Sequence, residues 1–161
     1  MKNNKLKIGQ LHVVEDKSAH SPSYYCLDKN ILINDQTVKA LYAIHMKRNY
    51  QPVRICLHRN TREKVHQMII IMPKSYQVPP HKHLFKEESY QMIRGRMVVN
   101  IYDDRGKIIE STVLDKKNFI YKSDKKQFHA IKPMTKYVVY QEIKCGPFVR
   151  KRDSIKPKWK S

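Results

Sequence analysis

The feature that most constrains the fold is a series of short apolar segments between Pro52 and Cys145. These segments are rich in Val, Ile and Tyr, and several alternate apolar with polar residues, as half-buried β-strands do. They cover residues 54–58, 65–72, 89–93, 96–102, 107–114, 119–121, 129–131 and 137–144. Turn residues separate the segments, and no helical pattern lies between them. Such a series favours an all-β sandwich or barrel over a parallel α/β sheet.

One helical pattern precedes the strands. Apolar residues at helical spacing predict a helix over residues 35–49. The stripe consists of Val38, Leu41, Ile44 and His45. Asn34 or Asp35 can cap the start of this helix, and Pro52 ends it. We therefore expect a basic N-terminal arm with the helix (1–50), a β-barrel domain (51–150) and a basic C-terminal tail (151–161).

The composition is strongly basic, since 33 Lys and Arg against 14 Asp and Glu give a net charge of +19. The lysines are spread over the whole chain, and only residues 150–160 form a dense basic run. No zinc finger, RNA-binding aromatic strand or helix-turn-helix pattern accompanies this charge. We therefore expect no specific nucleic-acid partner. The same positive charge could instead attract a small anionic ligand.

Two further patterns bear on where the chain works. No run approaches the roughly 18 consecutive apolar residues of a membrane span, and the N-terminus lacks the apolar centre of a signal peptide. Cys26, Cys56 and Cys145 are odd in number and form no CxxC pair, so we expect neither disulfides nor a zinc ribbon. These patterns predict a cytoplasmic protein with three reduced thiols.

The stretch PPHKHLFKEESYQMIRG (79–95) holds two histidines, two glutamates and a closing glycine. In a strand, His81 and His83 point to the same face about 6.6 Å apart, so two imidazoles can converge on one ion. Glu88 lies five residues beyond His83, far enough to start a neighbouring strand. Glu87 and Glu88 would point to opposite faces of that strand, so only one can enter a barrel. The stretch is either a solvated polar turn or most of a metal site.

The spacing H-x-H-x4-E-x6-G resembles the first motif of the cupin superfamily, whose two histidines and glutamate bind a metal inside a small β-barrel. The match favours Glu88 over Glu87. The superfamily also has a later histidine, and His129 in NFIYKSDKKQFHAIKP occupies its place, although the other residues of that second motif are absent. The resemblance implies an all-β fold, the cupin double-stranded β-helix or jelly-roll barrel, with an N-terminal helix.

The same resemblance implies one divalent metal ion, which could be iron, manganese, nickel or zinc. Its ligands would be His81, His83, Glu88 and His129. The alternative is a metal-free pocket built from the same four residues. We interpret four other histidines as structural or exposed, namely His12, His20, His45 and His66.

A closer resemblance runs from about residue 35 to 149. The segment that begins RICLHRNTREKVHQMIIIMPKSYQVPPHKH and the ending YQEIKCGPF (140–148) are similar to the WbuC-type cupin family. Members are small metalloproteins, often encoded among genes for bacterial surface polysaccharides. The similarity implies a substrate pocket beyond the metal. The residues assigned to it are Arg54, His58, Tyr76, Lys86, Glu142 and Lys144, and for each the alternative is an exposed residue.

The resemblance does not fix the reaction, and no catalytic residue is assigned. We expect a metal-binding cupin that acts on a sugar or sugar nucleotide in O-antigen or capsule biosynthesis, for example as an isomerase. A non-haem iron dioxygenase and a non-catalytic ligand-binding cupin are the alternatives. Because small cupins are commonly dimers and a barrel of this size has sheet edges to cover, we also expect a homodimer.

Overall fold

The computed structural model describes residues 5–159 and shows one helix and twelve strands in that range. The helix, α1, spans Asp35–Lys47. The strands are β1 (Leu6–Ile8), β2 (Leu11–Glu15), β3 (Ser23–Cys26), β4 (Val53–Cys56), β5 (Val65–Pro73), β6 (Val78–His81), β7 (Glu88–Arg94), β8 (Met97–Tyr102), β9 (Ile108–Leu114), β10 (Ile120–Ser123), β11 (Phe128–Pro133) and β12 (Tyr137–Cys145). Within this range, no helix combines the length and apolarity needed to cross a membrane.

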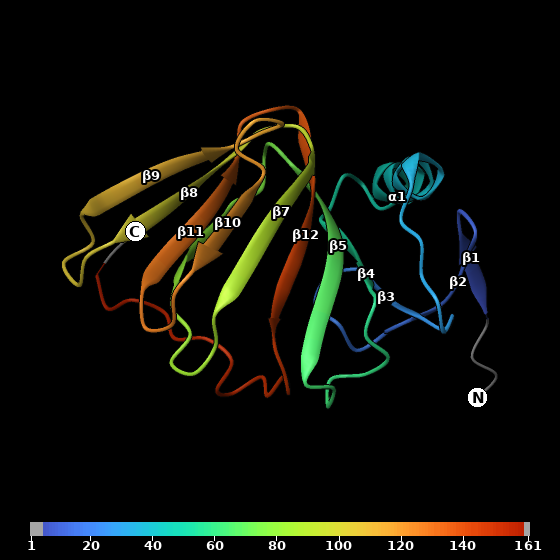
Figure 1. The fold of residues 1–161 in the computed structure, drawn as a ribbon, viewed down its shortest axis with the longest axis horizontal. Helices are drawn as coiled ribbons and strands as arrows, with labels where there is room; N and C mark the ends of the chain where they lie inside the picture. Colours follow the sequence, from blue (N-terminus) through green and yellow to red (C-terminus); the bar gives the residue numbers. More distant parts are fainter. Residues whose placement is uncertain (1–4, 160–161) are drawn as a thin grey trace.

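The strands form two sheets (Figure 1). The larger sheet has the order β1-β2-β3-β4-β5-β12-β7-β10, and the smaller one has the order β6-β11-β8-β9. All pairs are antiparallel except β3 with β4. This arrangement confirms the all-β prediction, and each strand expected from the pattern is present with ends that differ by a few residues.

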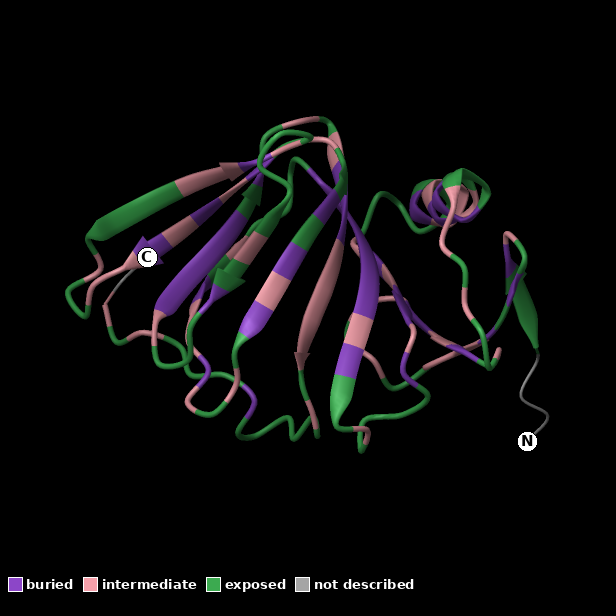
Figure 2. Ribbon diagram, in the orientation of Figure 1, coloured by how far each residue is buried: buried purple, intermediate pink, exposed green. Residues whose placement is uncertain are grey.

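The main apolar core lies between the two sheets. In β8, Met97, Val99 and Ile101 point inward and are fully buried, while the residues between them are partly exposed. They pack against larger-sheet side chains that include Met68 and Tyr140. Each such buried apolar side chain stabilises the fold by about 1.5–3 kcal/mol. Figure 2 shows the resulting band of buried residues along β11, in contrast to the exposed outer strand β9.

A second core lies on the outer face of the larger sheet. Val38 and Leu41 of α1 pack there against Ile55 and Ile71, which explains why β5 is apolar on both faces. The predicted cap is confirmed, because the Asn34 side chain accepts a hydrogen bond from the Thr37 backbone N–H at 3.0 Å.

The N-terminal residues are more ordered than the sequence indicated. Beyond the predicted segment 11–14, residues 6–26 form three strands that extend the larger sheet, and β3 pairs in parallel with β4. This pairing sets Ser23 opposite Arg54 and brings the β2–β3 loop beside the barrel. The short strands have weak patterns of their own because their burial depends on α1 and β4.

The C-terminal segment (residues 149–159) closes one end of the barrel. Ile155 and Lys82 exchange two backbone hydrogen bonds, of 3.0 and 2.8 Å. Trp159 packs edge-on against Phe128, with ring centroids 4.5 Å apart. The segment therefore contacts both stretches that carry the predicted metal-binding histidines.

Candidate metal centre

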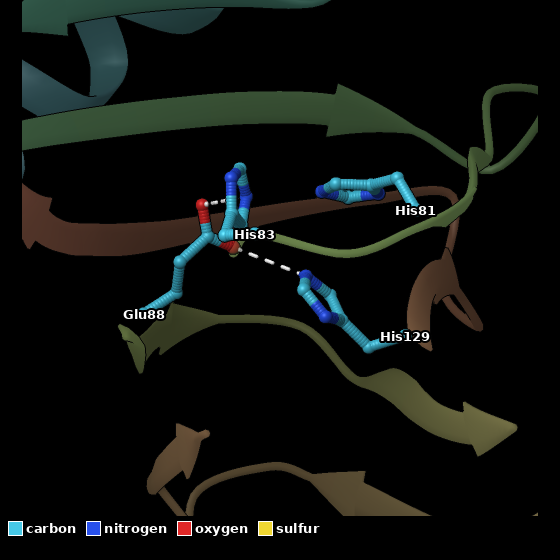
Figure 3. A group of neighbouring side chains, drawn as sticks. All are labelled: His81, His83, Glu88 and His129. Carbon is cyan, nitrogen blue, oxygen red and sulfur yellow. Dashed lines mark hydrogen bonds and ion pairs between the residues drawn. The ribbon is translucent and has the colours of Figure 1, made fainter. Parts of the chain in front are cut away.

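Three elements bring the predicted ligands together at this end of the barrel (Figure 3). His81 ends β6, His83 lies two residues later, and Glu88 begins β7. His129 lies in β11 directly opposite His81 in the strand pairing. Glu88 and His129 are almost completely buried, and so is His83.

The donor atoms converge. One donor atom from each of the four residues can be chosen so that all lie within 4.8 Å of one another. The Glu88 carboxylate lies between two imidazoles, with Oε1 2.8 Å from His83 Nε2 and Oε2 3.2 Å from His129 Nε2. Donors bound at about 2.1 Å on opposite sides of one ion are about 4.2 Å apart, so a small inward movement suffices to complete a site.

The histidines are held in the tautomer that metal binding requires. Each Nδ1 faces a backbone carbonyl: Pro79 for His81 at 3.0 Å, Gln127 for His129 at 3.0 Å, and Asp153 for His83. When Nδ1–H donates to such a carbonyl, the lone pair of Nε2 is left for a metal. Within residues 5–159, His83 Nε2 is also one of three buried side-chain polar atoms without a hydrogen bond of acceptable geometry. A metal ion would satisfy it.

Charge and burial set the protonation of the site. Burial and the neighbouring His129 lower the pKa of His81 to about 4, so its imidazole is neutral near pH 7. Burial alone would raise the pKa of Glu88, but the Lys144 ammonium and the close imidazoles of His129 and His83 hold it well below its usual value. The site therefore offers a neutral imidazole and an anionic carboxylate, as a divalent cation requires.

Two residues that support Glu88 were not predicted from the sequence. The Tyr90 hydroxyl donates to Glu88 Oε2 at 2.5 Å, and burial followed by the charge of Glu88 raises the pKa of this phenol well above 10. Tyr90 lies two residues after Glu88 in β7, so the period-2 pattern could have identified it. Asp153 is buried and pairs with Lys86 at 2.5 Å and with Lys144 at 3.5 Å. No local pattern in the basic tail indicates this role.

A family model described as a domain of unknown function (DUF6016) matches residues 33–114, just over half of the chain. The chain belongs to this family. No curated protein matches the chain at a significant level.

Solved structures similar to this DUF6016 member are cupins, and they confirm the double-stranded β-helix. CapF from Staphylococcus aureus, a capsular polysaccharide assembling protein, matches with a TM-score of 0.56 and 13% identity over 67% of this chain and 32% of its own. An uncharacterized double-stranded β-helix protein from Klebsiella pneumoniae matches at 0.53 and 11%, over 69% and 83%. L-ribose isomerase from Cellulomonas parahominis, with L-psicose, matches at 0.52 and 15%, over 65% and 68%. The chain spans only about a fifth to a quarter of several other matched structures.

Glu87, the rejected alternative ligand, is exposed and pairs with Lys122 at 2.9 Å. Of the other histidines, His12 pairs with Asp28 on the surface, and buried His45 has its Nδ1 2.7 Å from the Gln51 carbonyl oxygen. His66 is buried, and both His20 and His66 line a cavity beside the metal site.

The residues predicted to bind substrate fall into two groups. Arg54, His58, Tyr76 and Lys144 line the same cavity, which has a volume of about 300 Å³. Lys86 and Glu142 do not line it. The Lys86 ammonium pairs with Asp153 and donates to the Pro147 carbonyl at 2.8 Å, and Glu142 pairs with Lys144 at 3.3 Å. In this structure both residues therefore belong to the ion-pair network behind Glu88.

Proposed function

We propose that the protein is a metal-dependent cupin that acts on a sugar or sugar nucleotide in bacterial surface-polysaccharide biosynthesis. The observation that carries this proposal is the convergence of three imidazoles and the Glu88 carboxylate at the end of the barrel, beside a cavity. Two cupin-fold neighbours point the same way: one is named as a capsular polysaccharide assembling protein and another is an isomerase solved with a ketose. The resemblance to WbuC-type cupins belongs to the same proposal.

In this proposal, His81, His83, Glu88 and His129 hold one ion of iron, manganese, nickel or zinc. Bound there, such an ion would supply Lewis-acid chemistry towards the oxygens of a sugar. The chain supplies the rest of the site. Tyr90 and Lys144 keep Glu88 ionised and oriented, while the Asp153 carbonyl fixes the tautomer of His83. Arg54, His58, Tyr76 and Lys144 face the substrate from the cavity.

Function is tested by incubating metal-loaded protein with a panel of sugar phosphates and nucleotide-linked sugars and following the products by NMR. We expect conversion of at least one member, and loss of that conversion in His129→Ala. The exposed Arg105→Gln variant is the control and retains it. Conversion that continues unchanged in folded His129→Ala, or oxygen consumption in place of rearrangement, would contradict the proposed chemistry.

The proposal also includes the cellular setting expected from the sequence. The three cysteines, Cys26, Cys56 and Cys145, are free thiols, and the first two are buried, as suits a reducing cytoplasm.

A further inference from the structure

The cavity beside the metal centre is formed by parts of the chain far apart in sequence. Its walls come from the β2–β3 loop, from β3 to β5, and from β12 and the chain after it. Lining residues include Ser18, Tyr25, Arg54, His58, His66 and Arg150. A volume of about 300 Å³ is at the lower end of the range for small-molecule sites. None of the four metal-site residues lines it, so it is a compartment of its own.

Cations predominate in the lining. The charged residues of the lining are three cations, Arg54, Lys144 and Arg150, and one carboxylate, Asp16. Lys144 is already compensated, because Glu88, Glu142 and Asp153 each lie within 3.5 Å of its ammonium. The two arginines are the cations that remain available.

Neither arginine makes an ion pair within residues 5–159. Arg54 Nη2 donates to the Ser21 hydroxyl at 2.9 Å, and Arg150 Nη2 donates to the Ser18 carbonyl at 3.4 Å. A guanidinium has five N–H donors, so most donors of each arginine are free. Planar guanidinium groups match the paired oxygens of phosphates and carboxylates.

Two stacked imidazoles complete the wall. The rings of His58 and His66 are 4.1 Å apart at an interplanar angle of 4°. Burial and then the neighbouring His66 lower the pKa of His58 to about 4, and burial followed by Lys86 and Lys144 lowers that of His66. Both rings are therefore neutral hydrogen-bonding groups at pH 7. His66 Nε2 is buried and has no hydrogen-bond partner within residues 5–159, which calls for a ligand or a water.

The cavity is also close to the metal centre. His66, Lys144 and Glu88 lie opposite one another on the adjacent strands β5, β12 and β7. Neighbouring strands are about 4.8 Å apart, so the His66 wall is about 10 Å from the Glu88 strand. Lys144 lines the cavity and contacts Glu88, and it links the two compartments.

We propose that this cavity binds a small molecule that carries a phosphate or carboxylate group, with Arg54 and Arg150 as the anion contacts and His66 as a hydrogen-bonding partner. This inference deepens the proposed function, because it adds that the substrate carries an anionic group. That the ligand is the substrate rests on the proposed function. Arg150 thereby becomes a binding residue that the sequence did not indicate.

The test is calorimetric titration of the wild-type protein with glucose 1-phosphate, glucuronate and glucose, both metal-free and metal-loaded. At least one of the two anionic probes binds, and glucose binds at least tenfold more weakly. If only glucose 1-phosphate binds, the anionic group of the ligand is a phosphate. If only glucuronate binds, that group is a carboxylate. Arg54→Gln and Arg150→Gln each weaken anion binding at least tenfold, whereas Arg105→Gln on the exposed β8–β9 turn does not.

Circular dichroism and thermal unfolding establish that each variant is folded. The inference is overturned if neither anionic probe binds, or if both folded variants, Arg54→Gln and Arg150→Gln, bind the anion as the wild type does. His129→Ala separates this inference from the proposed function, because it removes a metal ligand and leaves the cavity intact. Loss of metal with anion binding retained in that variant supports a distinct anion site.

Discussion

At the scale of single residues, the candidate metal site depends most on Glu88. Its carboxylate contacts four side chains, those of His83, His129, Tyr90 and Lys144, and it is 4% exposed. A buried carboxylate is costly unless it is paired and hydrogen-bonded, so these neighbours do more than fill space. They fix the position of one metal-binding oxygen before any ion arrives.

Tyr90→Phe therefore lowers metal affinity. The substitution keeps the ring and its packing but removes the hydroxyl that donates to Glu88. Removal of such a supporting hydrogen bond weakens metal binding by about 10- to 100-fold. The matched control is Tyr140→Phe, since Tyr140 is also buried in the same core but makes no hydrogen bond to Glu88. Competition with a chelator measures both affinities, and equal values in the two variants would refute this role of Tyr90.

His58 makes stability depend on pH. Its pKa in the folded protein is about 4, below the ordinary value of 6.5. Between those pH values the unfolded chain binds more protons than the folded one, so the free energy of unfolding rises with pH. It decreases correspondingly as the pH falls from 6.5 to 4. The loss is on the order of 1–3 kcal/mol. Urea unfolding at pH 7 and 5 in chelator shows it, and His58→Phe reduces the difference between the two pH values. An undiminished difference in the variant would assign the effect to other groups.

At the scale of elements, the C-terminal segment connects the two halves of the site. Arg150 reaches the cavity, Asp153 reaches Lys86 and Lys144, and Ile155 pairs with Lys82 between the two histidines. Trp159 fixes the far end of the segment against Phe128. Residues 151–159, expected from the sequence as part of a basic C-terminal tail, thus pack against the barrel.

Trp159→Ala loosens this segment. The variant loses the aromatic contact with Phe128, and the chain after Phe148 becomes more open to protease. We expect cleavage in residues 149–159 to be several times faster than in the wild type, as followed by mass spectrometry. Phe119→Ala, at an aromatic residue that is 49% exposed, is the control and leaves the rate unchanged. The same rate in all three proteins would show that Trp159 does not hold the segment.

The sequence predicted what is encoded locally. The spacing of His81, His83 and Glu88 was recognised through its resemblance to the cupin motif, and α1 through its apolar stripe and cap, because both patterns are local. Asp153 and Arg150 were not identified, because their roles depend on where the chain goes after β12. The contact between His83 and Asp153 joins residues 70 positions apart. A local sequence pattern cannot predict a contact between residues so far apart in the chain.

At the scale of the whole molecule, the two sheets leave edges. β10 ends the larger sheet and β9 ends the smaller one, and both lie on the side away from α1 (Figure 1). Four apolar side chains in β9 and at the start of β10 are 47–59% exposed: Ile108, Ile109, Phe119 and Ile120. Exposed apolar edge strands are typical of surfaces covered by another chain.

We expect the predicted homodimer to form through these exposed strands. A charge in place of Ile109 or Ile120 would place an unpaired ion in an apolar interface, so Ile109→Glu and Ile120→Glu shift the protein towards monomer. Light scattering at micromolar concentration measures the mass. The exposed variant Arg105→Gln is the control and stays dimeric. A wild-type monomer would contradict the dimer, and dimeric glutamate variants would place the interface elsewhere.

Whether four convergent side chains hold one metal ion is decided by the metal content of the folded protein. Mass spectrometry on folded protein gives about one divalent ion per chain for the wild type. His81→Ala and His129→Ala each remove a ligand and lose most of the metal, whereas Arg105→Gln keeps it. Chelator-treated wild type takes up the ion again, and the two alanine variants do not. Full metal content in both folded alanine variants would show that the site lies elsewhere.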